Sequence, residues 1–300
     1  MRDVIRVRVP AKINLYLAVG PRRADGYHDL VTVFQAISLY DELAVRPAEE
    51  VTLVVRGEGA EFLPTGEENL AVRAARLLAE RAGVSGGAAL VLDKGIPVAG
   101  GMAGGSADAA AVLLGCDALW GTGLDRVALR ELAAELGSDT AFPLLGGTAV
   151  GTGRGEVLTA VPTAGQWHWV VALARGGLST PRVYAELDRL RELRHPPSLD
   201  NHDAVLAALR QPEPEYLAKA LGNDMQAAAL SLRPDLRKTL HAGEQAGALA
   251  AMVSGSGPSC LFLAASADHA EQLAAALAAG NSCRAVRVAS SPVDGAEILS

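Results

Sequence analysis

The sequence has few of the features that mark membrane proteins, secreted proteins or nucleic-acid-binding proteins. Aromatic residues make up only 4% of the 300 residues, which leaves little material for a surface that stacks bases. The net charge is −7 and no basic run offsets it, so nonspecific nucleic-acid binding is not expected. No run of 18 apolar residues occurs, and the N-terminus has no apolar signal core. We therefore expect a cytoplasmic protein with no nucleic-acid or membrane partner.

Cysteine is also scarce. Cys116, Cys260 and Cys283 are far apart, odd in number and without the CxxC or Cys/His spacing of a zinc site. The simplest interpretation is three buried thiols in a reducing compartment.

The overall composition is that of an ordinary globular protein, with half of the residues apolar and a fifth charged. The length allows two domains with a substantial core. Alternating strand and helix patterns predict an α+β fold, and we place the domain boundary near Val161, giving domains 1–161 and 162–300. No linker rich in proline or serine marks this border.

Residues 94–116, KGIPVAGGMAGGSADAAAVLLGC, are the most informative segment. An apolar strand, a loop with five glycines between Gly95 and Gly105, and an alanine-rich helix follow one another. Without Cβ atoms, the backbone N–H groups of such a loop can converge on an anion at the positive end of the helix. The alternative is a turn that only satisfies chain geometry. The segment has neither the P-loop pattern nor the spacing of a dinucleotide-binding loop.

The stretch PVAGGMAGGSADAA resembles the nucleotide loop of the GHMP kinases. The resemblance implies that the phosphates of ATP lie against this loop and that Mg²⁺ lies near the Ser106 hydroxyl. Many relatives have a second serine where this chain has Ala107. The implied fold is the two-domain GHMP kinase fold, with a ribosomal protein S5 domain 2-like N-terminal domain and a ferredoxin-like C-terminal domain. The implied ATP-binding residues of the loop are Pro97, Val98, Ala99, Gly100, Gly101, Met102, Ala103, Gly104, Gly105, Ser106 and Ala107.

The N-terminal segment has the alternating pattern of strands. Residues 4–9 alternate apolar and basic side chains, Pro10 is expected to end the pairing, and residues 11–20 resume the alternation. Lys12 and Asn14 share the polar face of this second part, and polar groups of this kind usually contact solvent. Asp25 and Gly26 predict a turn, and residues 30–39 a returning strand.

Residues 10–43, PAKINLYLAVGPRRADGYHDLVTVFQAISLYDEL, resemble the N-terminal signature of one GHMP kinase whose substrate is a cytidine diphosphate derivative of methylerythritol. That resemblance implies that Lys12, Asn14, Tyr27 and His28 line the substrate pocket. Tyr27 offers a flat face on which cytosine can stack, and His28 can form a hydrogen bond with a ring edge or an amide. Without the motif, a lone histidine after a turn is more often a surface residue.

A candidate catalytic aspartate follows a predicted helix over 125–136 that ends at Gly137. On local pattern alone, Ser138 and Asp139 look like the cap of a new turn. The resemblance instead implies that Asp139 is the catalytic aspartate. Asp139 would accept the proton of the acceptor hydroxyl, while Lys12 would keep that carboxylate ionised and orient the acceptor.

Other candidates depend on local pattern and resemblance together. Asn69 is placed to cap a helix, and the resemblance puts it at the border of the adenine pocket. Lys94 could reach nucleotide phosphates or lie solvated at a strand end. Ser179 and Thr180 precede a proline at a helix start, and by resemblance they approach the substrate diphosphate. Residues 254–258, SGSGP, form a tight turn that by resemblance packs beside the nucleotide loop.

The resemblance thus implies transfer of the γ-phosphoryl group of ATP to a hydroxyl of the methylerythritol derivative, with Mg²⁺, in isoprenoid precursor biosynthesis. The protein is expected to be a monomer or a weak homodimer. Two alternatives remain: another GHMP kinase, of the homoserine or mevalonate-pathway type, and a noncatalytic nucleotide-binding relative. The DGYH and LYDEL motifs argue against the first, and the presence of both Lys12 and Asp139 argues against the second.

Overall fold

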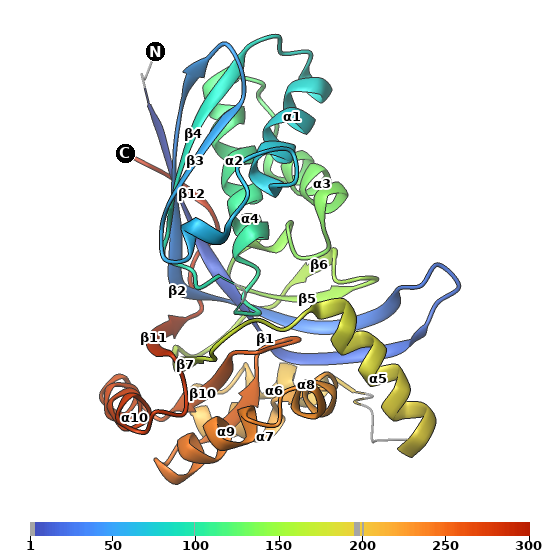
Figure 1. Cartoon of the computed structure of the whole chain (residues 1–300), viewed down its shortest axis with the longest axis vertical. Coiled ribbons are helices and arrows are strands. Elements are labelled where there is room, and N and C mark those ends of the chain that lie inside the picture. Colours follow the sequence, from blue (N-terminus) through green and yellow to red (C-terminus); the bar gives the residue numbers. More distant parts are fainter. Residues whose placement is uncertain (1–3, 99, 195–198, 200) are drawn as a thin grey trace.

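The computed structural model describes residues 4–98, 100–194, 199 and 201–300. These residues form two sheets with helices packed against them, as Figure 1 shows. The predicted α+β class is confirmed.

The larger sheet contains the N-terminal strands and two short strands from the second half of the chain. Its main order is β12-β1-β2-β4-β3, while β5 pairs with β2 and β6, and β8 pairs in parallel with β1. The strands are β1 (Ile5–Arg22), β2 (His28–Ala48), β3 (Thr52–Gly57), β4 (Gly87–Lys94), β5 (Thr148–Thr152), β6 (Val157–Ala160), β8 (Gly222–Asn223) and β12 (Glu297–Leu299).

Strands β1 and β2 form a long hairpin. The prediction that Pro10 ends the pairing is wrong, because β1 continues through it to Arg22. Pro10 instead marks a register shift: it lies opposite Tyr40, whereas Ala11 lies opposite Ile37. Proline has no N–H to donate, and a bulge is one of the few places where a paired strand accepts it. The extra residues, Ser38 and Leu39, belong to β2 and lie opposite the point where the polar residues of β1 begin.

Four helices and a 3₁₀ turn accompany the larger sheet, and Figure 1 shows the helices on one of its faces. Helix α2 lies at the centre, where alanines and a glycine let it approach the strands. A Cβ atom on Gly115 would lie 2.8 Å from Cγ2 of Val45. The elements are η1 (Ala60–Phe62), α1 (Leu70–Ala82), α2 (Gly104–Trp120), α3 (Arg126–Leu136) and α4 (Phe142–Leu145).

Several predicted helix ends are confirmed. The side chain of Asn69 accepts a hydrogen bond from the Ala71 N–H and caps α1. Helix α3 spans the predicted residues and is followed by Gly137. Ser138 and Asp139 lie in a turn, as their local pattern predicts, whereas the N-cap of α4 is Ala141.

The smaller sheet, in the order β11-β7-β10-β9, belongs to the second half of the chain. Its strands are β7 (Trp167–Leu173), β9 (Ala250–Val253), β10 (Cys260–Ala264) and β11 (Ala285–Ser291). The helices are α5 (Thr180–Arg194), α6 (Asp203–Ala208), α7 (Pro214–Ala220), α8 (Gln226–Leu232), α9 (Leu236–Gln245) and α10 (Ala267–Ala279). The predicted helix start at Thr180 is confirmed by α5, and Pro234 lies between α8 and α9.

None of the helices in the described ranges has the length and apolar character needed to cross a membrane. The prediction of three buried thiols is confirmed for Cys116, Cys260 and Cys283. Burial raises the pKa of Cys116 and of Cys260 to about 12, and it also raises the pKa of Cys283.

The buried cysteines predict low thiol reactivity in the native state. The thiolate is the reactive species, and a raised pKa leaves it scarce at pH 8. We expect almost no reaction of the native protein with an aromatic disulfide reagent at pH 8, and complete reaction of all three thiols in denaturant. Absorbance of the released thiolate measures both. A thiol that reacts at the rate of a free cysteine in the native protein would contradict this arrangement.

Candidate active site

A cavity of about 460 Å³ lies where the two halves of the chain meet. Strands β1 and β2 contribute residues near Lys12 and Phe34, and the segment 63–70 lines another side. The glycine loop, Asp108 and Asp139 come from the first half, whereas α5 and the 254–258 turn come from the second. Most of the residues predicted for nucleotide and substrate therefore face one space.

The glycine loop packs tightly against the 254–258 turn. A Cβ atom on Gly101, whose φ is +74°, would lie 2.5 Å from the carbonyl oxygen of Ser254. The Ser254 hydroxyl also donates a hydrogen bond to the Gly101 carbonyl, at 3.3 Å. The predicted packing of this turn beside the nucleotide loop is confirmed, and it requires glycine at position 101.

Helix α2 begins directly from the loop, with Ala103 in the left-handed conformation at φ 57°. The side chain of Ala103 cannot cap the helix, and the first N–H groups of a helix have no partner within it. These N–H groups, on Gly104 and the residues after it, lie at the positive end of the 17-residue helix. This end of the cavity can bind an anion.

Lys12 and Asp139 form an ion pair in the same cavity lining. The Lys12 ammonium group lies 3.2 Å from Oδ2 of Asp139 and donates a hydrogen bond to Oδ1 of Asn14 at 2.8 Å. The Lys12 side chain is 6% exposed, whereas that of Asp139 is 36% exposed. The solvent-facing interpretation of Lys12 and Asn14 is therefore wrong, since both are buried.

A chain of hydrogen bonds holds this pair in place. Nδ2 of Asn14 donates to the Thr32 hydroxyl at 2.7 Å, and that hydroxyl donates to the Tyr16 carbonyl at 2.8 Å. The backbone N–H of Lys12 donates to the Met102 carbonyl at 3.3 Å. Strand β1 thus connects the ion pair to the glycine loop. The Lys12 ammonium group is held by Asp139 and Asn14.

Lys94 also lines the cavity but is buried, so the interpretation of it as solvated is wrong. Its ammonium group pairs with Asp41 and, at 2.6 Å, with Oδ2 of Asp108. Burial alone would lower the pKa of Lys94, but the charges of Asp108 and Asp41 outweigh it and raise that pKa. Burial also raises the pKa of Asp108, although the charge of Lys94 opposes the shift. Sequence reasoning missed both aspartates.

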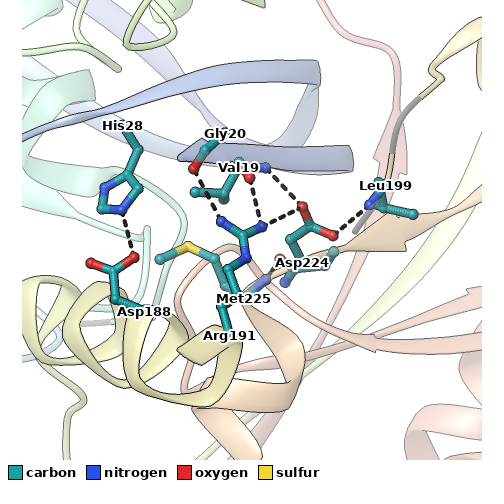
Figure 2. Close-up of polar contacts among 9 residues, drawn as sticks. Val19, Gly20, His28, Asp188, Arg191, Leu199, Asp224 and Met225 are labelled. Carbon is teal, nitrogen blue, oxygen red and sulfur yellow. Dashed lines mark hydrogen bonds and ion pairs between the residues drawn. The ribbon is translucent and has the colours of Figure 1, made fainter. Parts of the chain in front are cut away.

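Helix α5 forms a wall of the cavity next to the β1–β2 hairpin. Tyr184 of this helix lines the cavity and stacks on the His28 ring, with 4.9 Å between ring centroids. Figure 2 shows Nε2 of His28 facing the carboxylate of Asp188, 2.9 Å from Oδ1. Tyr27 is 55% exposed, lies under the Arg154 guanidinium group and is not part of the described cavity lining. His28 is not part of the described cavity lining either, but it packs on Tyr184, which is.

A second set of contacts pins α5 to the same hairpin. Arg191 donates hydrogen bonds to the carbonyls of Val19 and Gly20, at 2.6 and 3.0 Å, as Figure 2 shows. Arg191 also lies 3.2 Å from Asp224, whose carboxylate accepts the N–H groups of Val19 and Leu199 at 2.9 Å. Sequence reasoning missed these residues and the partners of His28.

The remaining predicted residues fall into three groups. Asn69 and Thr180 line the cavity, and the Thr180 and Ser256 hydroxyls lie 2.8 Å apart. Ser179 is exposed, Ser106 is half-buried and Ala107 is buried; within the described ranges, none of the three belongs to the lining. Ala99 lies outside the described residues. The other described loop residues from Pro97 to Gly105 line the cavity.

Comparison with known proteins adds independent information. The model of the GHMP kinase N-terminal domain matches residues 69–147, and that of the GHMP kinase C-terminal domain matches residues 205–282. Together they cover more than half of the chain. The chain belongs to the GHMP kinase family.

Some known proteins are similar to this chain over nearly its whole length. A 4-diphosphocytidyl-2-C-methyl-D-erythritol kinase from Salinispora tropica is 61% identical over 298 residues, covering 98% of this chain and 94% of the relative. A crystal structure of 4-(cytidine 5'-diphospho)-2C-methyl-D-erythritol kinase is 36% identical with a TM-score of 0.75, covering 95% of this chain and 98% of that one. A homoserine kinase from Cytophaga hutchinsonii shares the fold, with a TM-score of 0.77 at 19% identity, covering 100% of this chain and 98% of that one.

The close packing of Gly101 predicts that alanine destabilises this GHMP kinase at position 101 but not at position 105. Gly101→Ala should destabilise the protein by about 1–3 kcal/mol, because the new Cβ meets the Ser254 carbonyl and the backbone there is left-handed. Gly105→Ala is the matched control, since the nearest atom to its Cβ would be Cδ1 of Leu70, at 3.8 Å. Alanine inside a helix is favoured over glycine. Thermal unfolding of both variants measures the difference, and equal melting temperatures would contradict this packing.

Proposed function

We propose that this protein is an ATP-dependent kinase that phosphorylates the 2-hydroxyl of 4-diphosphocytidyl-2-C-methyl-D-erythritol in the methylerythritol phosphate pathway of isoprenoid precursor biosynthesis. The observation that carries the proposal is the Lys12–Asp139 pair facing a cavity that the glycine loop also lines. The names and high identity of the full-length relatives support the choice of substrate.

Phosphoryl transfer requires mainly positioning and neutralisation of charge, because its transition state is loose and highly charged. In the proposed reaction the N–H groups at the start of α2 bind the phosphates of ATP. Oδ2 of Asp139 is held by Lys12, which leaves Oδ1 to accept the proton of the acceptor hydroxyl. The ammonium group of Lys12 orients that hydroxyl and stabilises the carboxylate as a base.

Magnesium fits the residues present. The carboxylates of Asp108 and Asp139 line the cavity, and Oδ1 of Asp108 is buried without a hydrogen-bond partner among the described residues. Carboxylate and hydroxyl oxygens are ligands that Mg²⁺ accepts, and it is commonly held by one or two carboxylates, phosphates and water. By resemblance, we propose the Ser106 hydroxyl as a protein ligand. When bound, the ion would neutralise charge on the β- and γ-phosphates.

The acceptor is proposed to lie between the β1–β2 hairpin and α5. Tyr184 and the neighbouring His28 provide aromatic surface and a hydrogen-bonding edge for cytosine. Asn14 holds Lys12 toward the acceptor, and Thr180, with Ser179 before it, lies at the start of α5, where the positive end of a helix suits a diphosphate. Neither Tyr27 nor His28 belongs to the described cavity lining, so their proposed contacts with cytosine require the tip of the hairpin to move toward the ligand.

We also propose a domain division, a cellular location and an oligomeric state. The domain division near residue 161 is supported by β6, which ends at Ala160, and by the smaller sheet, which starts with β7. A cytoplasmic location agrees with the three buried free thiols, and we propose a monomer or a weak homodimer.

The substrate assignment predicts selective turnover. Purified enzyme with ATP and Mg²⁺ should release ADP when the cytidine substrate is added, with little release in the presence of homoserine or mevalonate. A coupled assay for ADP measures this directly. Turnover of homoserine or mevalonate in preference would establish another GHMP kinase activity, and ATP binding without any turnover would favour the noncatalytic alternative.

The role of Asp139 predicts a separation of catalysis from nucleotide binding. Asp139→Asn should lower kcat by about 10²–10⁴-fold, the usual contribution of a positioned base. The Kd for ATP should change little, because the phosphates bind to the loop. Glu131→Gln, on the exposed surface of α3, is the control and should retain full activity. Near-normal kcat in the Asp139→Asn enzyme would overturn the assignment.

A further inference from the structure

Asp41 lies where the pairing between β2 and β4 ends. The pairing ends at Glu42 of β2 and Asp93 of β4. Asp41, which directly precedes Glu42, therefore lies next to the start of the glycine loop. Oδ1 of Asp41 accepts the N–H groups of Gly95 and Ile96, each at 2.8 Å. The carboxylate thus replaces the backbone acceptor that a longer strand would have supplied. Asp41 is fully buried, which makes these bonds inaccessible to competing water.

The other oxygen of Asp41 pairs with Lys94, and Lys94 pairs in turn with Asp108 on α2. Residues 94 and 108 bracket the whole glycine loop, so their ion pair ties its two ends together. A Cβ atom on Gly95 would lie 2.4 Å from the Tyr40 carbonyl, which shows how closely the loop start packs on β2. The ion-pair cluster Asp41–Lys94–Asp108 therefore closes the base of the loop.

Such a cluster is costly to maintain, since taking charges out of water opposes their attraction. A buried ion pair is weak evidence for stability, and apolar residues would often serve stability as well. The cluster does, however, restrict a loop whose glycines have unusual conformational freedom. Holding the loop in its binding conformation before the ligand arrives removes part of the entropic cost of binding.

We propose that Asp41 is a positioning residue for nucleotide binding, fixing the start of the loop through Gly95 and Ile96 and its far end through Lys94 and Asp108. This inference rests on the proposed function only in that the loop binds the phosphates of ATP. Asp41 lines no part of the cavity in the described residues, so it acts through the loop and touches no substrate.

The direct test is Asp41→Asn. Both carboxylate oxygens of Asp41 accept hydrogen bonds, whereas asparagine has one accepting oxygen and one NH2 group that only donates. The variant can therefore accept from the two loop N–H groups or from Lys94, but not from both. Hydrogen bonds to charged groups contribute enough to predict about ten- to a hundredfold weaker ATP binding. Calorimetric titration with ATP gives Kd, and steady-state assays should show a raised KM for ATP with the KM for the acceptor within about twofold of wild type.

The neighbouring Glu42→Gln is the matched control, because it removes the same charge from an exposed side chain on the same strand. It should leave Kd for ATP unchanged. A merely structural role would lower the melting temperature of Asp41→Asn without separating the two KM values. Unchanged Kd for ATP in folded Asp41→Asn would overturn the proposal.

Hydrogen exchange of the wild-type enzyme provides a test that does not depend on a variant folding. The amides of Gly95 and Ile96 should be protected both with and without ATP, whereas those of residues 100–105 should gain protection only when ATP is bound. Rapid exchange at Gly95 and Ile96 in the free enzyme would overturn the proposal. The calorimetric titration with ATP and the hydrogen exchange both omit the acceptor, so failure to phosphorylate the cytidine substrate would count against the proposed function and not against this proposal.

Discussion

The buried charge of Lys12 is the constraint on which the architecture of the site depends. An ammonium group removed from water must be compensated by an anion and by hydrogen-bond acceptors. Asp139 supplies the charge, Asn14 supplies an acceptor, and the Phe34 ring lies 5.2 Å below the ammonium group. These groups come from β1, β2 and the turn before α4. Compensating one lysine therefore fixes the relative positions of three elements around the proposed reaction centre.

One segment of the second half of the chain, the 254–258 turn, approaches Asn14 and Lys12 through its backbone. Gly255, with φ +53°, approaches so closely that a Cβ atom would lie 3.3 Å from Oδ1 of Asn14. Asn223 holds that turn by donating from Nδ2 to the carbonyls of Val253 and Gly255, at 2.8 and 2.7 Å. Because β8 pairs with β1, the same segment that anchors the turn also extends the sheet that carries Lys12. Hydrogen bonds next to the site therefore hold the two halves of the chain in position relative to each other.

Features governed by neighbours in sequence could be predicted from the sequence. Asn69 caps a helix through a residue two positions away, and the glycine loop and the helix after it are contiguous. The resemblance supplied Lys12 and Asp139, whose 127-residue separation no local rule connects. Pro10 was misjudged because a bulge depends on the partner strand. Asp41, Asp108, Tyr184 and Asp188 were missed because their significance comes from partners brought close only by folding, such as Asp188 to His28. Lys94 had the pattern of an exposed strand end, and only the packing of α2 made it buried.

We propose that the glycine loop directs a bound triphosphate toward the Lys12–Asp139 pair. The most direct measurement is a crystal structure with a nonhydrolysable ATP analogue and the cytidine substrate bound together. The expected result is that the phosphates lie along residues 100–105, with the terminal phosphate and the acceptor hydroxyl both next to Asp139. A triphosphate bound elsewhere, or a terminal phosphate directed away from that carboxylate, would contradict it.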